Sequence, residues 1–142
     1  MAVNETNKQR YLRFYKGAIN DQNYVLVDET VSPDVISHDA FPGQATGPEG
    51  LKQTFAMFHQ AFPDLHAKEQ VVVADGDLVA ARFLVTGTHK GDFMGQAATG
   101  NPVSYTEAVF VRFRDGKIVE HWAVADVTAL MAAISPTGAP DH

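Results

Sequence analysis

Residues 102–127 read "PVSYTEAVFVRFRDGKIVEHWAVADV", and this stretch decides the fold. Two runs rich in valine and aromatic residues flank Asp115–Gly116, a dipeptide that favours a tight turn between antiparallel strands. We therefore predict a β-hairpin here. Such an apolar pair of strands is stable only when another layer covers it, so the rest of the chain has to supply that layer.

The predicted turn also fixes which side chains share a face, because directly paired residues in a hairpin point the same way. The face expected to lie under helices holds Tyr105, Glu107, Val109, Val111, Phe113, Ile118, Glu120, Trp122, Val124 and Asp126. The other face holds Thr106, Ala108, Phe110, Arg112, Arg114, Lys117, Val119, His121, Ala123 and Ala125. In this register His121 points away from Asp126, and only a β-bulge would change that.

The preceding sequence supplies helices and a second hairpin. Apolar residues recur at helical spacing in 5–20 and 48–62, and shorter helices are expected at 22–31 and 128–134. Residues 66–91 are rich in β-branched residues and are interrupted by "DGD", which predicts another hairpin. Helices first and a mainly antiparallel sheet afterwards are typical of the α+β class.

Composition restricts the function without naming it. The 142 residues suit a single domain, 1–142, whose tail 135–142 we expect to be frayed. The absence of cysteine favours a cytoplasmic protein, and the net charge of −6 argues against nucleic-acid binding. No apolar run is long enough to cross a membrane. The histidines lack metal-ligand spacing, so no metal is expected.

Three stretches resemble a known family. "GQATGPEGLKQTFAMFHQAFPDL", "GTHKGDFMGQAATGNPVSY" and "FRDGKIVEHWAVAD" are similar to the SnoaL-like polyketide cyclases, also labelled ester cyclases. This family belongs to the superfamily shaped like nuclear transport factor 2 (NTF2) and ketosteroid isomerase. The likeness covers residues 8–134.

The resemblance implies an NTF2-like cone, in which a curved sheet wraps around about three helices and encloses an apolar pocket. It also implies ring closure by intramolecular aldol chemistry, with acid/base catalysis and without a metal or organic cofactor. An aspartate near the end of the last strand is the acid/base in such cyclases, and Asp126 matches that position. The loop position that helps to bind substrate corresponds to His38.

Asp126 has two interpretations. In the functional one it is a general base in the pocket, where burial would raise its pKa towards a range useful for proton transfer. In the structural one it caps the helix that begins near Val127, a position where aspartate is favoured. The first interpretation makes Asp126, with His38 and His89, the candidate catalytic group.

Five residues are candidates for substrate binding: Tyr105, Glu107, Trp122, Phe55 and Phe58. Tyr105 is either a hydrogen-bond donor to an enolate oxygen or a core aromatic residue. Glu107 is either a polar group of the pocket or half of an ion pair with Arg82 or Arg112. Trp122 is expected in the pocket wall, and the phenylalanines in the core or at its mouth.

Two histidines lie in loops that could reach the pocket. His38 could act as an acid, a base or a donor near neutral pH, although a lone loop histidine is often solvated. His89 begins a glycine-containing segment that could serve as a lid over the pocket.

These observations leave two functional hypotheses. The first is a cyclase or related isomerase or lyase that acts on an apolar carbonyl compound, with Asp126 as the proton shuttle. The second is a small-ligand-binding protein that has the same pocket and no chemistry. In both, the partner is a small molecule. A homodimer or higher homo-oligomer, most simply a dimer, is expected because one apolar cluster lies on the uncovered face: Ala108, Phe110, Val119, Ala123 and Ala125.

Overall fold

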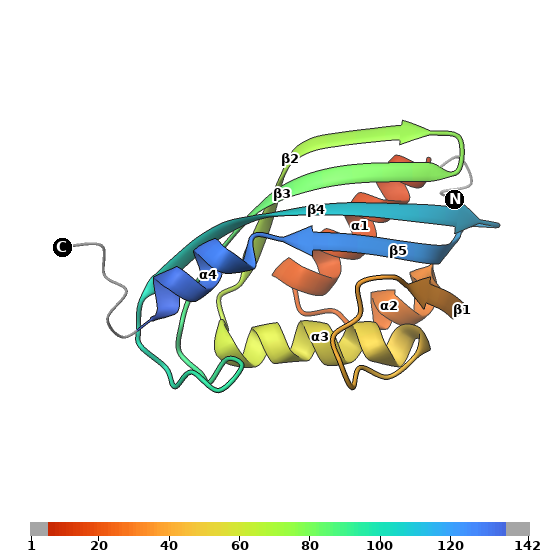
Figure 1. Ribbon diagram of the computed structural model, residues 1–142. Coiled ribbons are helices and arrows are strands. Elements are labelled where there is room, and N and C mark those ends of the chain that lie inside the picture. The colour runs from red at the N-terminus through yellow and green to blue at the C-terminus, as the bar shows by residue number, and fades with distance from the viewer. Residues whose placement is uncertain (1–5, 136–142) are drawn as a thin grey trace.

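The computed structural model describes residues 6–135, which form five strands and four helices (Figure 1). The elements in chain order are α1 (Asn7–Asn20), α2 (Val25–Thr30), β1 (Val31–Ser37), α3 (Gly47–Ala61), β2 (His66–Asp75), β3 (Leu78–Thr88), β4 (Pro102–Arg114), β5 (Lys117–Ala125) and α4 (Val127–Ile134). The strand order is β1-β5-β4-β3-β2, and only β1 and β5 run parallel. The α+β class is therefore confirmed. The expected frayed tail lies, apart from Ser135, outside the described residues.

The long helices form where the sequence predicts them. The Thr6 side chain accepts a hydrogen bond from the Gln9 backbone and the Gln9 side chain returns one, so a capping box begins α1. Pro48 lies in the first turn of α3, where its missing N–H costs nothing. Both hairpins are also confirmed, and Asp115 and Gly116 have the positive φ angles that their turn requires.

The strand β1 is not among the predicted elements, because the sequence favours a short helix up to residue 31 and Pro33 disfavours a strand. Proline cannot donate to a strand ladder, but it is tolerated at the edge of a sheet. Here β1 occupies that edge and pairs with β5 alone. This pairing brings the loop that follows β1 alongside β5, where His38 N donates to His121 O at 2.9 Å.

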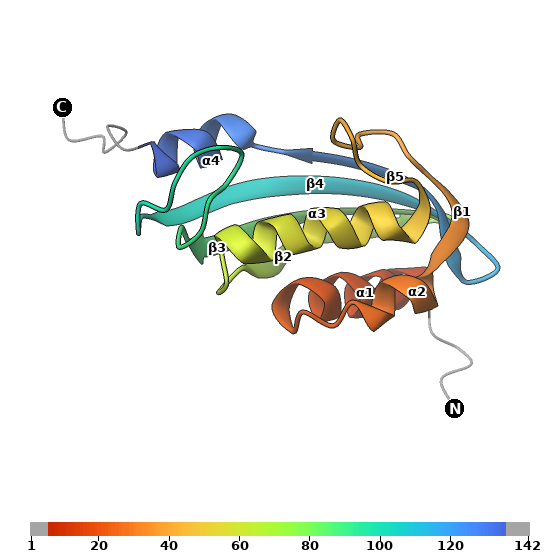
Figure 2. The same ribbon diagram turned by 90° about the horizontal axis from the view of Figure 1, so that it is seen from below.

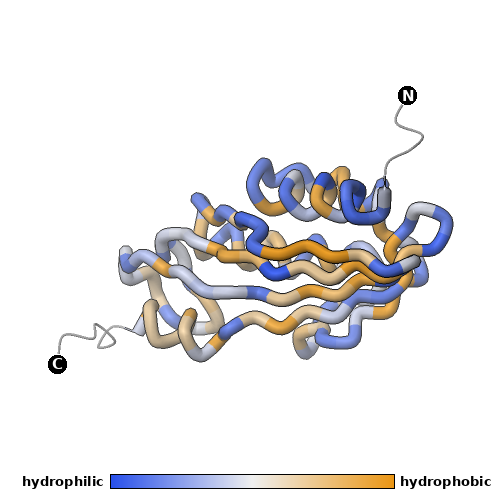
Figure 3. The backbone as a smooth tube through the Cα atoms, turned by 90° about the horizontal axis from the view of Figure 1, so that it is seen from above, coloured by the Kyte–Doolittle hydropathy of each residue, from blue (hydrophilic) through white to orange (hydrophobic). Residues whose placement is uncertain are grey.

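Helices α1, α2 and α3 pack on one side of the sheet, and α4 lies against its end beside β4 (Figure 2). The buried core between the layers is largely aromatic on the helix side and is completed by valines of β3 and β4. Figure 3 looks at the other side, where the strands are not crossed by a helix. This outer apolar face carries the exposed side chains Ile36, Val71, Val73, Phe110 and Val124.

Candidate functional site

A cavity of about 380 Å³ opens between the inner face of the sheet and helices α3 and α4. A volume of this size suits a small organic ligand. Leu51, Phe55, Phe58, Phe93 and Leu130 form its apolar wall. Its polar lining groups are Tyr15, Ser37, Asp39, Gln44, Thr54, Glu107 and His121. The expectation that Phe55, Phe58 and Glu107 border a pocket thus agrees with the geometry.

A β-bulge decides which residues of β5 reach this cavity. The turn pairs Phe113 with Ile118 as predicted, but the next pair is Arg112 with Glu120. Val119 is therefore an extra residue, and every later side chain of β5 changes face. The predicted faces were right for β4 and wrong for β5 beyond Ile118.

The bulge turns His121 into the cavity, against our prediction. His121 pairs with Val111, and Ala123 pairs with Val109, so both lie on the inner face. Small alanines on this part of β5 leave the space that the cavity fills. Ala123 and Ala125 consequently do not belong to the outer apolar face, where Trp122 and Val124 take their places.

His121 sits in an environment that keeps its imidazole neutral. Burial lowers the pKa of His121 to about 4. The negative charge of the nearby Asp39 opposes this shift, and the charge interaction with His38 adds to it. Asp39 is held in place because its Oδ2 accepts a hydrogen bond from Ala123 N at 2.9 Å. The side chain of His121 is partly exposed because it borders the cavity. A neutral imidazole beside a fixed carboxylate is suited to accepting a proton from a ligand.

At the Glu107 end, the cavity and the recess behind it are lined by a carboxyl and two phenols. The Tyr15 hydroxyl donates a hydrogen bond to Glu107 Oε1. Burial raises the pKa of Glu107, and the hydrogen bond from Tyr15 only partly opposes this. Tyr105 lies in the wall of a recess of about 40 Å³ that continues from this end and shares Tyr15 and Glu107. Burial, and then the Glu107 charge, raise the pKa of Tyr105.

Glu107 does not form the ion pair that was the alternative interpretation. Arg82 donates instead to the Gln70 side chain, and Arg112 lies on the outer face between Glu120 and Asp77.

Asp126 caps helix α4, which is the structural one of its two interpretations. Its Oδ1 accepts a hydrogen bond from Ala129 N at 3.0 Å, which makes it the N-cap of α4. The side chain is exposed and is not among those that line the cavity. The expectation that Asp126 faces the pocket is therefore wrong, because a residue that ends a strand and begins a helix is used to satisfy free N–H groups.

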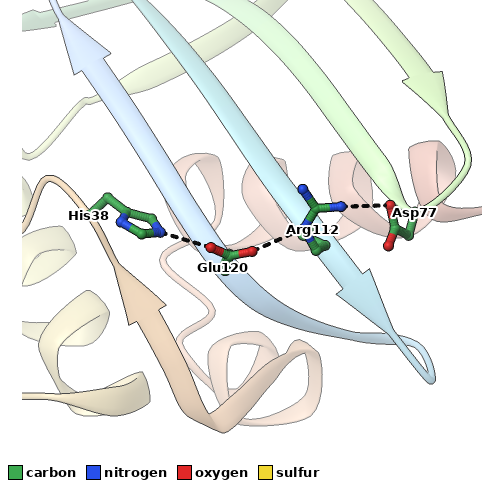
Figure 4. A network of polar contacts seen from close by, with 4 residues as sticks. All are labelled: His38, Asp77, Arg112 and Glu120. Atoms are coloured by element: carbon green, nitrogen blue, oxygen red, sulfur yellow. Dashed lines mark hydrogen bonds and ion pairs between the residues drawn. The ribbon is translucent and has the colours of Figure 1, made fainter.

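Trp122 and His38 lie on the outer side of the sheet and stack on each other, with ring centroids 4.6 Å apart. His38 also belongs to a row of polar contacts with Glu120, Arg112 and Asp77 (Figure 4). The distances are 2.9 Å from His38 to Glu120, 3.0 Å from Arg112 to Glu120, and 3.0 Å from Arg112 to Asp77. The predictions that Trp122 forms a wall of the pocket and that His38 reaches it are thus wrong. The bulge in β5 explains the outward position of Trp122.

His89 is fully buried in the segment after β3, but it does not line the cavity. Its Nδ1 accepts from Thr99 N at 3.2 Å and lies 2.9 Å from the Thr99 hydroxyl, so it organises the loop 89–101. The prediction that His89 lies in the pocket is wrong, although Phe93 and Met94 of the same loop do line it.

The described part of the chain contains no group of three or more histidine, cysteine or acidic residues placed to hold a metal ion. Within residues 6–135 no helix is both long and apolar enough to span a membrane.

Comparisons with known proteins extend this picture. The profile of the SnoaL-like polyketide cyclases matches residues 9–134. The chain belongs to this family. Wild-type IdmH from Streptomyces antibioticus superposes with a TM-score of 0.79 at 32% identity, covering 90% of this chain and 97% of that one. A SnoaL-like protein from Jannaschia sp. CCS1 gives a TM-score of 0.80 at 27% identity, covering 94% and 92%. The NTF2-like cone is thereby confirmed.

Among curated proteins, the relative DauD from Streptomyces sp. (strain C5) is 27% identical over 106 residues, or 74% of this chain. DauD is named an aklanonic acid methyl ester cyclase. The matched region spans 64% of the length of DauD, so less than two thirds of that protein is represented here.

Sequence reasoning missed His121, Asp39 and Tyr15 as cavity residues. One signal could have identified His121. The register without a bulge placed Glu120 under the helices without a partner, which is a costly position for a carboxylate. A shift of one residue removes that cost and moves His121 inward.

Proposed function

We propose that this protein is a cyclase that closes a ring in a carbonyl-bearing polyketide by intramolecular aldol addition, with His121 as the acid/base. The observation that supports this most is the neutral imidazole of His121 at the wall of an apolar cavity, beside the fixed carboxylate of Asp39. The family and the name of the relative DauD suggest the substrate class.

In the proposed reaction, His121 removes a proton from a carbon next to a carbonyl group of the substrate. The resulting enolate carbon attacks a second carbonyl carbon of the same molecule, which forms the new carbon–carbon bond. The alkoxide left on that second carbon takes the proton back from the imidazolium. No atom or electron is gained or lost, so the reaction requires no cofactor.

Asp39 stabilises the transient positive charge of His121 in this scheme. An imidazole whose pKa is lowered to about 4 is fully available as a base at neutral pH, but it is a weak one. When an enolate forms beside it, the negative charges of the enolate and of Asp39 both favour the imidazolium. The apolar wall meanwhile keeps water away from the enolate.

The test is turnover of aklanonic acid methyl ester, followed by liquid chromatography and mass spectrometry. Ring closure gives a product of unchanged mass with a new retention time. We expect His121→Asn to lower kcat by about 10²–10⁴-fold, the usual effect of losing a general acid/base. The matched control is Asp126→Asn, which should keep the wild-type rate because Asp126 caps α4 away from the cavity.

The same assay decides between enzyme and binding protein. The cap formed by Asp126 favours the binding hypothesis over a catalyst that works through Asp126. If the wild type binds the ester without converting it, the protein is a binding module for this ligand class. If His121→Asn turns over at the wild-type rate, the acid/base is a different group.

A further inference from the structure

The apolar lining of the cavity divides by exposure into an inner wall and a rim. Leu51, Phe93 and Leu130 are buried and belong to the inner wall. Met94 and Val127 also line the cavity, but they are exposed to solvent, at 58% and 44%. Because exposed lining residues lie where a cavity opens to solvent, these two side chains mark its mouth.

The base of the loop 89–101, which carries Met94, is fixed to both helices that border the cavity. Gly91 N donates to Ala61 O at the end of α3 at 3.1 Å. Asn101 Nδ2 donates to Ala133 O of α4 at 3.0 Å. Figure 2 shows the loop between the ends of these two helices. This base holds the tip of the loop beside the mouth.

The tip of the loop is a tight turn that displays Met94. Phe93 N donates to Gln96 O and Gln96 N donates to Phe93 O, both at 2.9 Å, so Met94 and Gly95 are the two turn residues. Both have the positive φ that such a turn requires, 49° for Met94 and 89° for Gly95. The Phe93 ring anchors the turn, with its centroid 5.1 Å from that of Phe58. The Met94 side chain is thereby presented to solvent at the mouth.

Met94 adopts a backbone conformation that is unfavourable for its residue type. Among residues 6–135, the other non-glycine residues with positive φ are Gln22 and Asp115. Aspartate tolerates this conformation, and Gln22 is held by its side chain, which donates to Pro63 O at 3.2 Å. Met94 has neither advantage, and its exposed side chain adds little to the core. Strain of this kind clusters at residues that serve a function other than stability.

We propose that Met94 is a ligand-binding residue that closes over the apolar part of the ligand at the cavity mouth. Its thioether side chain is flexible and adapts to apolar surfaces of different shape. Closure buries apolar surface that the free protein exposes, so it adds affinity without a hydrogen bond. This inference rests on the proposed function only in taking the same cavity as the ligand site.

The experiment measures binding of the fluorescent ketone 6-acetyl-2-(dimethylamino)naphthalene to the wild type, Met94→Gly and Met94→Leu. Glycine suits the positive φ, and this offsets the lost side-chain contacts, so Met94→Gly should unfold within about 2 °C of the wild-type midpoint. Its dissociation constant for the probe should still rise about five- to tenfold, because the ligand no longer buries a methionine side chain. Met94→Leu keeps an apolar side chain and should stay within about twofold of the wild-type constant.

Asp115→Gly is the matched control, because Asp115 has the same positive φ in a turn that does not line the cavity. It should leave the dissociation constant unchanged. An unchanged constant in Met94→Gly would overturn the proposal. A thermal midpoint of Met94→Gly lowered by more than about 5 °C would also overturn it, since Met94 would then be a packing residue. Failure of the probe to bind the wild type would have the same consequence.

Oxidation gives an independent measurement on the wild type. Hydrogen peroxide transfers one oxygen atom to a methionine sulfur, which yields the sulfoxide and water. Peptide mass spectrometry follows this gain of oxygen at Met94, and at Met57 and Met131, which do not line the cavity. A saturating concentration of the probe should slow the oxidation of Met94 and leave the other two rates unchanged. Equal rates at Met94 with and without the probe would contradict closure.

The outcome is separable from that of the cyclase assay. With aklanonic acid methyl ester, Met94→Gly should raise KM and change kcat little, because Met94 contacts the ligand away from the reacting atoms. His121→Asn should keep the affinity for the probe and the protection of Met94, although it loses turnover. If the wild type shows this binding and protection but no turnover, the cyclase proposal fails while the role of Met94 stands.

Discussion

The placement of His121 makes a prediction about acid stability that needs no substrate. A histidine that is buried in the neutral form stabilises the folded state less as the medium becomes acidic, because only the unfolded chain takes up the proton. The perturbation is His121→Gln, which removes the titrating group and keeps a polar side chain. We expect this variant to lose less stability than the wild type when the pH is lowered from 7 to 4.5.

The magnitude follows from the two pKa values. The ordinary pKa of 6.5 applies to the unfolded chain, and the folded value is about 4. The folded pKa is lower, so the contribution is constant above about pH 6.5 and is lost as pH falls towards 4. At pH 4.5 the loss is about 2–3 kcal/mol at most, since one pKa unit corresponds to about 1.4 kcal/mol. Solvent in the cavity reduces this figure.

The assay is urea unfolding of the wild type and the variant at the two pH values. Carboxyl groups that titrate in this range, Glu107 included, are common to both proteins and cancel in the difference. His66→Gln is the matched control, because it removes an exposed imidazole and should follow the wild type. Equal acid losses in the wild type and in His121→Gln would refute the inward position of His121 and, with it, the shifted register of β5.

Two further predictions concern residues outside the cavity. Asp126→Ala should lower the free energy of unfolding, measured in urea, by about 0.5–2 kcal/mol because the α4 cap is lost. Asp126→Asn should leave this free energy nearly unchanged, because asparagine also caps helices. We also predict that the outer apolar face joins two copies of the chain. Light scattering at micromolar concentration should then give twice the 15.4 kDa mass of the chain. Phe110→Lys places a charge on this face and should give the monomer. A monomeric wild type would contradict the dimer.

Much of the fold was predictable because local signals and global structure agree. The apolar spacing of α3, the Asp115–Gly116 turn and the interruption at residues 75–77 each depend on neighbours in the sequence. The edge strand β1 was not predictable in this way. Its residues Pro33 and Asp34 disfavour a strand locally, and only the exposed edge of β5 makes the pairing favourable.

The site was less predictable because one residue decides it. Phe113 and Ile118 pair as the turn requires, and then Val119 is inserted without a glycine or proline to signal it. Side chains alternate between the two faces of a strand only up to such a bulge. Beyond it, every residue lies on the face opposite to the predicted one. That is why the inward positions of Tyr105 and Glu107 on β4 agree with the structure, whereas those of Trp122 on β5 and Asp126 just beyond it do not.

The bulge links the two sides of the sheet physically. It moves Glu120 outward, where its carboxylate bridges Arg112 and His38 and where hydrogen bonds from both lower its pKa. His38 is thereby tied to β5 by its side chain as well as by its backbone N–H. Asp39 is the next residue, and it reaches the cavity and accepts from Ala123 N. The shift that brings His121 inward therefore also builds the outer contacts that hold its neighbouring carboxylate, so the His121–Asp39 pair depends on a single feature of β5.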